Sequence, residues 1–393
     1  MSKEIVALSA MRSPVGSFGG GLSSVAPADL GALVAKEAFS RAGVDPGQVT
    51  YAVVGNVIPC GANFPYVSRL ATVRAGMAME STVMAVNRLC GSAMQAIISV
   101  SQNIMLGDAE MGLAGGIEVM SGGGYLSAAM RNGARMGDTS MVDLMVSTLT
   151  DPFGAGHMGM TAENQAVKWG ISREQQDAFA LESQTRAARA ISEGRFTSQI
   201  VPVTLKTRKG DVVFDTDEHP KATTLEALAK MRPAFKKEGG TVTAGNASGI
   251  NDGAAFLVLA DAVAANRGGH KPIARLVSYA VAGVEASLMG DGPIPSTQIA
   301  LERGGVKLDQ IDVIEANEAF AAQALAVVKG LGLDPDKTNP NGGAIALGHP
   351  VGATGAVIVT KLLHEMVRTN ARYGLATMCI GGGQGITTIW ERC

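Results

Sequence analysis

Apolar runs alternate with helical patterns in the first third of the 393-residue chain. Strand-like runs begin at Ile5, Tyr51 and Met111, and a helical pattern extends from Pro27 to Ala42. Strands separated by helices are typical of βαβ units. The pattern therefore predicts an α/β fold with a mostly parallel sheet covered by helices.

The last third repeats this alternation. Residues 273–279 and 311–316 read as strands, residues 295–303 read as a helix, and another helix is expected from about Ala319. In each half a long apolar helix is followed by a segment that ends in a glycine-rich turn. We therefore predict that the two halves are copies of one unit.

The section between the halves differs from them in composition and in its hydrophobic pattern. It contains a glycine triplet, many methionines and short helical pieces such as residues 172–192, and it is too long for a simple connection. It is predicted to be a cap or an inserted domain, after which the strand-like residues 255–260 return to the N-terminal half. The predicted parts are residues 1–121 for the N-terminal half, completed by about 251–270, residues 122–250 for the inserted section, and residues 271–393 for the C-terminal half.

Two cysteines stand where strand-like runs give way to small residues. Cys90 precedes an almost uncharged helical pattern, and the N-terminus of a helix favours thiolate over thiol. Cys379 is expected near the tip of a hairpin of two buried strands. The alternatives are that Cys90 is a small buried hydrophobe and that the hairpin glycines mark a bulge or a tight packing site.

One histidine lies in a glycine-rich run. His349 precedes Pro350, which suits the first position of the helix expected from about Gly352, and the flanking glycines let backbone and ligand approach closely. The alternative is a loop histidine whose hydrogen bonds are satisfied. Two thiols and one imidazole are sufficient for acyl transfer and for proton transfer at carbon.

Composition excludes several classes of protein. The chain has 33 basic and 35 acidic residues and no polybasic stripe, which argues against nucleic acid or an anionic membrane as partner. Four cysteines do not make a disulfide framework in so long a chain. No signal or transit peptide is recognised, and no apolar stretch is expected to reach the length of a membrane span, so a cytoplasmic location is predicted.

Four motifs together resemble those of the thiolase family: the Cys90 segment, residues 339–355, the Cys379 hairpin and Asn317-Glu-Ala-Phe320. The similarity extends over essentially the whole chain, and residues 157–164 and 243–253 look most like bacterial biosynthetic-type members. The resemblance implies a thiolase fold, in which two similar halves form a five-layered α/β/α/β/α core. It also implies that the inserted section is a loop domain that covers the active site and binds coenzyme A.

The resemblance implies reversible Claisen condensation of two acetyl-CoA molecules to acetoacetyl-CoA and CoA through an acyl-Cys90 intermediate. His349 would accept the Cys90 proton, and Cys379 would remove the α-proton of the second acetyl-CoA. The N–H groups of Cys90 and Gly381 would form one oxyanion hole, and His349 with a water held by Asn317 would form the other. A helix N-cap is the alternative role for Asn317, and both roles can hold at once.

The implied partners are acyl-CoA and CoA as substrate and product, without a metal or other cofactor, in a homotetramer. Residues implied to line the CoA channel are Leu149, His157, Met158, Phe235, Ala244, Ser248, Ala319 and Phe320. Lys221 is also implied to contact the nucleotide of CoA. The chain departs from the family pattern at this position, where related enzymes often carry arginine, and at Ala227, which replaces a serine. The run from Met120 to Gly124 also lacks the usual proline, next to residues 121–138, which look like a tetramerisation loop.

Three alternatives to an acetyl-CoA-specific enzyme follow from the same resemblance. One is a broader-chain 3-oxoacyl-CoA thiolase of β-oxidation, which rates on long substrates would separate. Another is a non-catalytic acyl-CoA-binding protein on the same fold, against which the joint presence of Cys90, Asn317, His349 and Cys379 argues. Decarboxylating condensing enzymes share the fold, but they usually lack a base like Cys379, because loss of CO2 generates their carbanion.

Overall fold

The N-terminal half contributes five strands of the main sheet, in the order β1-β12-β5-β3-β4, with the short β2 (Gly16–Ser17) paired to β12. The computed structural model describes residues 3–393. The five strands are β1 (Ile5–Arg12), β3 (Tyr51–Gly55), β4 (Thr82–Val86), β5 (Met111–Val119) and β12 (Asn251–Asp261). As expected, the chain returns to this half at β12, which lies between β1 and β5.

The C-terminal half repeats the arrangement in the order β13-β16-β15-β14. Its strands are β13 (Ala274–Gly283), β14 (Val313–Ala316), β15 (Tyr373–Ile380) and β16 (Gln384–Arg392). Each strand pair of this half is parallel or antiparallel like the corresponding pair of the N-terminal half. In the place of β4, a single parallel bridge joins Ile314 to Thr338. Within residues 3–393, two residue pairs between β1 and β13 join the half-sheets. The predicted internal repeat is confirmed.

The sheet is mixed, so the prediction of a mostly parallel sheet was wrong. Only β3–β4, β3–β5 and β14–β15 are parallel, and the other main pairs are antiparallel. The physical reason is that β12 enters between two existing strands after a long excursion, while β15 and β16 form a hairpin. Neither connection is the helical crossover that a parallel pair requires.

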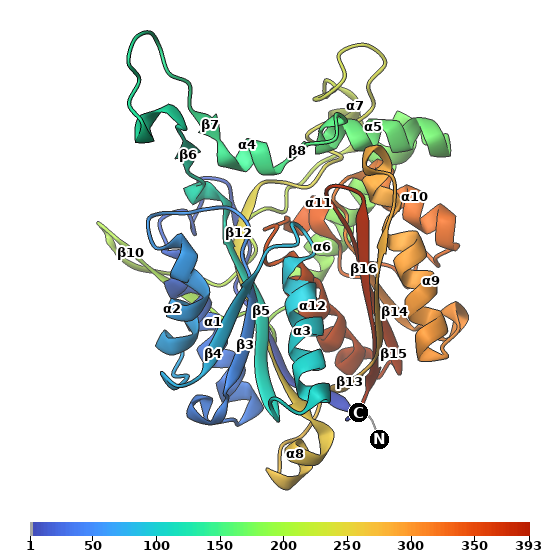
Figure 1. Ribbon diagram of the computed structural model, residues 1–393. Coiled ribbons are helices and arrows are strands. Elements are labelled where there is room, and N and C mark those ends of the chain that lie inside the picture. Colours follow the sequence, from blue (N-terminus) through green and yellow to red (C-terminus); the bar gives the residue numbers. More distant parts are fainter. Residues whose placement is uncertain (1–2) are drawn as a thin grey trace.

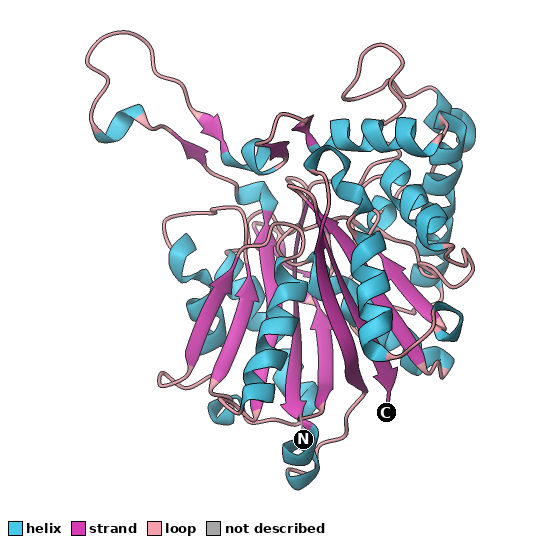
Figure 2. Ribbon diagram, turned by 45° about the vertical axis from the view of Figure 1, so that its right-hand side comes forward, coloured by secondary structure: helices cyan, strands magenta, loops and turns pink. Residues whose placement is uncertain are grey.

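Helices and half-sheets form five layers (Figures 1 and 2). Helices α1 (Pro27–Ala42) and α2 (Val67–Arg74) cover the outer face of the N-terminal half-sheet, and α9 (Pro293–Gly304) and α10 (Ala321–Leu331) cover that of the C-terminal half-sheet. Helices α3 (Ser92–Leu106) and α12 (Thr354–Thr369) lie between the half-sheets, where their apolar side chains form the central core. The predicted five-layered α/β/α/β/α architecture is confirmed.

Within residues 3–393, the segment Leu89–Leu106 is long and apolar enough to cross a membrane when only length and composition are considered. This differs from the expectation that no stretch reaches that length. Helix α3 makes up most of the segment, and core helices of ordinary domains meet the same criteria. Burial between two half-sheets accounts for its composition, because such a helix is apolar on all sides.

Most predicted helices are present with small shifts at their ends. Helix α1 has the predicted bounds, and α6 (Arg173–Ser192) begins after Ser172, whose side chain and that of Gln175 form a capping box. The prediction for Pro350 was wrong, because α12 begins only at Thr354. Pro350 instead lies in the loop before this helix, and its carbonyl accepts the N–H groups of Ala353 and Thr354.

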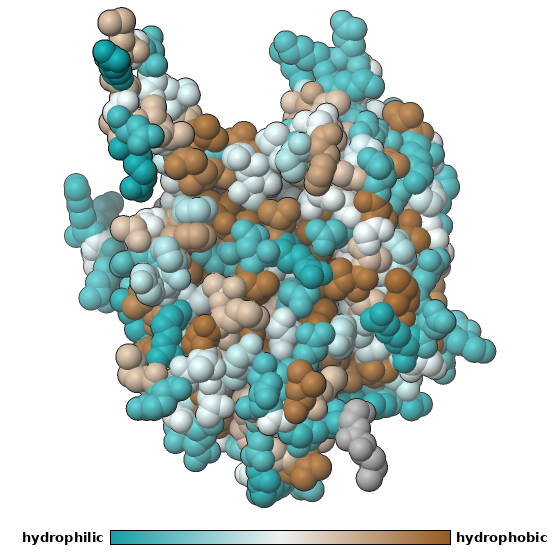
Figure 3. Space-filling model, in the orientation of Figure 1, coloured by the Kyte–Doolittle hydropathy of each residue, from teal (hydrophilic) through white to brown (hydrophobic). Residues whose placement is uncertain are grey.

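The inserted section lies across one end of the two halves (Figure 1). Its elements are β6 (Tyr125–Leu126), β7 (Val142–Asp143), α4 (Leu144–Thr148), β8 (Thr150–Asp151), β9 (Gly156–His157), α5 (Met158–Trp169), α6, β10 (Val203–Thr207), β11 (Gly210–Phe214) and α7 (Leu225–Ala229). Residues 124–143 project as an arm, and hydrophobic surface lies at its base (Figure 3). The predicted boundaries at residues 121, 250 and 270 stay predictions. The remaining helices are α8 (Ala262–Arg267) and α11 (Ala344–Leu347).

Candidate active site

Cys90 lies in the turn between β4 and α3, one residue before the N-cap Gly91. Leu89 has φ 46°, and the Ser92 hydroxyl fixes the turn by donating to the Leu89 carbonyl at 2.6 Å and accepting the Arg88 N–H at 2.9 Å. A Cβ at Gly91 would stand 2.4 Å from Ile380 Cδ1, so only glycine allows this turn to approach the hairpin of the other half. The predicted turn-to-helix position of Cys90 is therefore present, and it faces the hairpin.

Cys379 is the second-last residue of β15 and is paired with Gly385 of β16, as the predicted hairpin requires. The turn of the hairpin brings the N–H of Gly381 close enough to the Cys90 thiol to lower its pKa, and an ionised Cys90 would raise the pKa of Cys379. The two thiols are therefore close in space, although they come from different halves.

Burial controls the protonation of both thiols. It raises the pKa of Cys90 to about 11, although the N–H groups of Gly381 and of Cys90 itself lower it. The prediction that Cys90 favours thiolate was wrong, because the loss of hydration exceeds the effect of the helix N-terminus. Burial, and to a smaller extent the charge of Cys90, raises the pKa of Cys379 as well. At neutral pH both thiols are protonated.

His349 lies in the loop between α11 and α12, and the residue is 6% exposed. Its Nδ1 lies 2.6 Å from the Thr354 hydroxyl, which donates its only proton to the Pro350 carbonyl at 2.8 Å. The hydroxyl must therefore accept a proton from Nδ1, which leaves Nε2 as the free basic nitrogen. Burial lowers the pKa of His349 to about 4, so the imidazole is neutral at neutral pH.

Three buried polar atoms of the predicted site have no hydrogen-bond partner: Nε2 of His349 and both side-chain atoms of Asn317. The backbone N–H of Asn317 donates to the carbonyl of Thr377, two residues before Cys379, at 3.0 Å. An unpaired buried polar group costs about 1–3 kcal/mol, so such atoms mark a place where a ligand or water completes the bonding. The alternative N-cap role of Asn317 was wrong, since α10 has Phe320 at its N-cap.

Comparisons with known proteins agree with this geometry. Models of the thiolase N-terminal and C-terminal domains match residues 5–262 and 270–392. The chain is 56% identical to beta-ketothiolase BktB of Cupriavidus necator over 393 residues and 50% identical to acetyl-CoA acetyltransferase of Syntrophomonas wolfei over 398 residues, each covering 100% of both chains. Human mitochondrial 3-ketoacyl-CoA thiolase in complex with CoA is 42% identical, with TM-score 0.96 and coverage of 100% and 98%.

The chain belongs to the thiolase family.

Most of the residues expected to line the CoA channel of this thiolase form one cluster beside Cys379. Met158, Ala319, Phe320 and Cys379 pack together with Phe235 in an apolar cluster. His157 stacks on Phe235 with ring centroids 4.7 Å apart, and Phe235 meets Phe320 edge-on at 6.1 Å. The Sδ of Met158 lies 3.4 Å from the position that a Cβ of residue 381 would occupy. We call the five residues Met158, Phe235, Ala319, Phe320 and Cys379 the channel cluster.

Backbone contacts bring the other expected channel residues to the same place. The N–H of Ser248 donates to the carbonyl of Ala319 at 3.0 Å, and that of Met158 donates to the carbonyl of Leu149 at 2.8 Å. Leu149 packs in the same apolar cluster as Cys90. His157 has a structural role that the sequence did not indicate, because its Nδ1 accepts the Gly159 N–H at 3.1 Å and caps α5.

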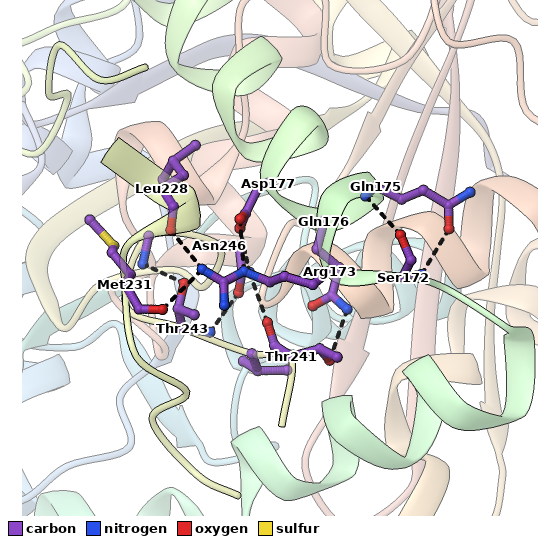
Figure 4. Close-up of polar contacts among 12 residues, drawn as sticks. Ser172, Arg173, Gln175, Gln176, Asp177, Leu228, Met231, Thr241, Thr243 and Asn246 are labelled. Carbon is purple, nitrogen blue, oxygen red and sulfur yellow. Dashed lines mark hydrogen bonds and ion pairs between the residues drawn. The ribbon is translucent and has the colours of Figure 1, made fainter. Parts of the chain in front are cut away.

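A polar network anchors the segment of residues 228–246, which carries Phe235 and the exposed Ala244 (Figure 4). Arg173 of α6 donates to the carbonyls of Leu228 and Met231 and to Asp177. Asp177 in turn accepts from Asn246 at 2.9 Å. The position of the segment is thus fixed by α6 rather than by its own secondary structure.

Lys221 is exposed and lies apart from these contacts. Its backbone N–H donates to Gln184 of α6 at 3.0 Å, and the residue lines a surface cavity of 530 Å³ with Leu181 and Thr223. Contact of Lys221 with the nucleotide stays a prediction.

Sequence reasoning missed three polar residues that contact the segment of His349. They are Thr354, Asn251, which accepts the His349 N–H at 2.9 Å, and Glu118, which accepts the Gly352 N–H at 2.8 Å. One signal was available: Glu118 is the only charged residue in the strand from Met111 to Val119, and its side chain is fully buried. A charge in a buried strand usually has a specific partner.

Proposed function

We propose that this thiolase catalyses the reversible condensation of two acetyl-CoA molecules to acetoacetyl-CoA and CoA, and thiolysis in the reverse direction. One observation carries the proposal: Nε2 of His349 and the amide of Asn317 are buried and unpaired, and their segments contact those of the two thiols. Asn317 is hydrogen-bonded to Thr377 in the strand of Cys379, and Val351, two residues after His349, belongs to the apolar cluster against which Cys90 packs. The names of the relatives and the CoA complex of the human enzyme support acyl-CoA as the substrate class.

In the first half-reaction, Nε2 of His349 removes the Cys90 proton while the sulfur attacks the thioester carbonyl. Concerted transfer is needed, because the raised pKa of Cys90 disfavours a free thiolate and the lowered pKa of His349 provides a neutral base. The tetrahedral intermediate breaks its bond to the CoA sulfur, which takes the proton back from His349. The products are acetyl-Cys90 and CoA.

In the second half-reaction, the Cys379 proton passes to Nε2 of His349, and the Cys379 thiolate removes an α-proton of the second acetyl-CoA. The enolate carbon attacks the acetyl group on Cys90 and expels the Cys90 thiolate, which takes the proton from His349. Every group then returns to its initial state. In thiolysis Cys379 acts as an acid, and its raised pKa keeps the required proton in place.

Two sets of donors would stabilise the negative oxygens. The N–H groups of Cys90 and Gly381 both lower the pKa of the Cys90 thiol, so they would suit the tetrahedral oxyanion at the carbon bonded to its sulfur. The enolate oxygen would accept from protonated Nε2 and from a water bound by Asn317. Because Nδ1 is held by Thr354, Nε2 is available for both roles.

These steps use only groups of the chain, with CoA as substrate and product, and require no metal or other cofactor. The proposed partners are acyl-CoA and CoA, without nucleic acid or membrane. The cytoplasmic location stays a prediction, which fractionation of the producing cells would test.

The rate of thiolysis on substrates of increasing length tests the proposal and its chain-length preference. We expect the highest kcat/KM on acetoacetyl-CoA, because Met158 packs on Gly381 and Cys379 where an acyl tail would pass. Met158→Ala should shift the preference toward longer chains, since each buried methylene contributes about 0.8 kcal/mol, or roughly fourfold. Rates on acetoacetyl-CoA and on longer 3-oxoacyl-CoA are compared for both proteins.

Met160→Ala is the matched control, because it shortens a methionine of the same helix outside the channel cluster. It should keep the wild-type profile. If the wild-type enzyme prefers long chains, the alternative of a β-oxidation thiolase is favoured. The similarity to human 3-ketoacyl-CoA thiolase is consistent with this alternative. Absence of thiolysis on every substrate would favour the non-catalytic acyl-CoA-binding protein.

We also propose a homotetramer, built as a dimer of dimers. Strand β4 pairs with β3 only within the described chain, so its other edge is open for a second copy. The arm exposes Leu126, Met136 and Val142, with Met136 95% exposed. Apolar side chains on a projecting arm are typical of a contact surface.

Light scattering should give a mass of four times 40.3 kDa for the wild-type protein. The double variant Leu126→Asp/Val142→Asp, which places charges on a cross-strand pair of the arm, should give a dimer. Val212→Asp on the exposed β10–β11 hairpin is the control and should remain tetrameric. A stable wild-type monomer at micromolar concentration would contradict the proposal.

A further inference from the structure

Glu118 is a buried carboxylate with four N–H donors. Its Oε1 accepts from the Asn56 side chain and from the Ile58 N–H, each at 3.1 Å, and its Oε2 accepts from the N–H groups of Val57 at 3.2 Å and Gly352 at 2.8 Å. No cation pairs with it among the ion pairs of residues 3–393. A buried charge without a counter-ion is costly, so stability alone does not explain this residue.

The four donors belong to two different halves of the molecule. Residues 56–58 follow β3 in the N-terminal half, whereas Gly352 ends the loop that begins at His349. Glu118 therefore attaches the far end of this loop to the N-terminal half. We call residues 349–352 the histidine loop.

Asn251, at the start of β12, holds the near end of the histidine loop. Its Oδ1 accepts the His349 N–H at 2.9 Å, and its Nδ2 donates to the Gly16 carbonyl at 3.0 Å. Gly348 has φ 101°, and a Cβ there would stand 2.5 Å from the Asn251 side chain, so the loop lies directly against it. Both ends of the histidine loop are thus bound by side chains of the N-terminal half.

Cys90 belongs to the N-terminal half as well, and it packs against the apolar cluster that contains Val351 from the middle of the histidine loop. His349 comes from the other half, so chain connectivity does not set its distance from the nucleophile. We propose that Glu118 and Asn251 are positioning residues, which hold the histidine loop so that Nε2 of His349 meets the Cys90 thiol. This inference rests on the proposed role of His349 as the base.

Glu118→Gln tests the proposal, because an amide of the same shape turns one acceptor oxygen into a donor that faces N–H groups. We expect kcat for thiolysis to fall about 10- to 100-fold with little change in KM, as for a misplaced base. Assays are run above pH 8, because burial raises the pKa of Glu118 to about 8 and only the carboxylate accepts all four bonds. Unchanged kcat would overturn the proposal.

Asp217→Asn is the matched control for a lost buried carboxylate. Asp217 accepts the Val15 N–H at 2.8 Å and pairs with Arg12, away from the histidine loop. We expect a lower melting temperature with kcat unchanged. An equal fall of kcat in the control would show a general effect of destabilisation and would also overturn the proposal.

The decisive measurement is the rate of Cys90 alkylation by iodoacetamide in two backgrounds. Glu118→Gln should slow alkylation in the wild-type protein and cause no further loss in His349→Ala, because both changes remove the same base. A further loss of equal size in His349→Ala would refute action through His349. If His349→Ala itself leaves alkylation and thiolysis at wild-type rates, the proposed function fails independently of the positioning residues. Should Glu118→Gln not fold, Asn251→Ala replaces it with the same expected results.

Discussion

Cys90→Ala is expected to abolish formation of the acyl-enzyme and to lower the rate of thiolysis by about 10⁴-fold or more, the scale seen when a nucleophile is removed. The physical reason is that Cys90 is the thiol whose pKa the N–H of Gly381 lowers, and it packs against the apolar cluster that contains Val351 of the histidine loop. Incubation with labelled acetyl-CoA and intact-mass measurement detect the adduct. The fold should persist, because the half-buried side chain is replaced by a smaller one.

Cys60→Ala is the control for loss of a thiol. Cys60 is also half-buried, but it lines a separate cavity of 440 Å³ with residues of α1 and α2. This variant should be acetylated like the wild-type protein. Appearance of the adduct on Cys90→Ala at the wild-type rate would assign the nucleophile to another residue.

Cys379→Ala is expected to separate the two half-reactions. Cys90 should still be acetylated, whereas exchange of the acetyl-CoA methyl protons with deuterated solvent should fall by about 10²- to 10⁴-fold, the usual contribution of a general base. Acetylation and proton exchange should respond differently because Cys379 lies in the channel cluster, close to the acylated sulfur but not bonded to the acyl group. Mass spectrometry and proton NMR measure the two steps.

Cys379→Ser provides the control for the volume lost at this 1%-exposed position. A hydroxyl fills the space but is a far weaker acid than a thiol, so exchange should stay low while the fold is retained. Exchange at the wild-type rate in both variants would place the α-proton base elsewhere and would remove Cys379 from the proposed mechanism.

The local patterns of the sequence predicted elements well where one short segment determines the structure. The helix from Pro27 to Ala42, the helix after Ser172 and the hairpin around Cys379 need only periodicity, capping and glycine turns. The Cys90 turn and His349 were also found in this way, since glycines and proline mark both. Their assembly into one region depended on the family resemblance rather than on spacing.

What could not be predicted depends on partners that are distant in the sequence. The direction of β12 is set by β1 and β5, and the protonation of Cys90 by burial under the other half, against the effect of its own helix. Likewise, Asn317 does not cap α10, and Pro350 does not start α12. Glu118 and Asn251 contact the histidine loop from positions 234 and 98 residues away in the sequence, so no local pattern indicates these contacts.

The internal repeat makes Cys90 and His349 counterparts of each other. Cys90 precedes α3, which leads into β5, and His349 precedes α12, which leads into β15, the strand in the equivalent place of the second half-sheet. An ancestral single half that paired with itself would present the same residue twice at this junction. Duplication within one chain removes that constraint, because the two positions can then diverge into a nucleophile and a base. The roles proposed for Cys90 and His349, nucleophile and base, would then derive from one position of the repeated unit.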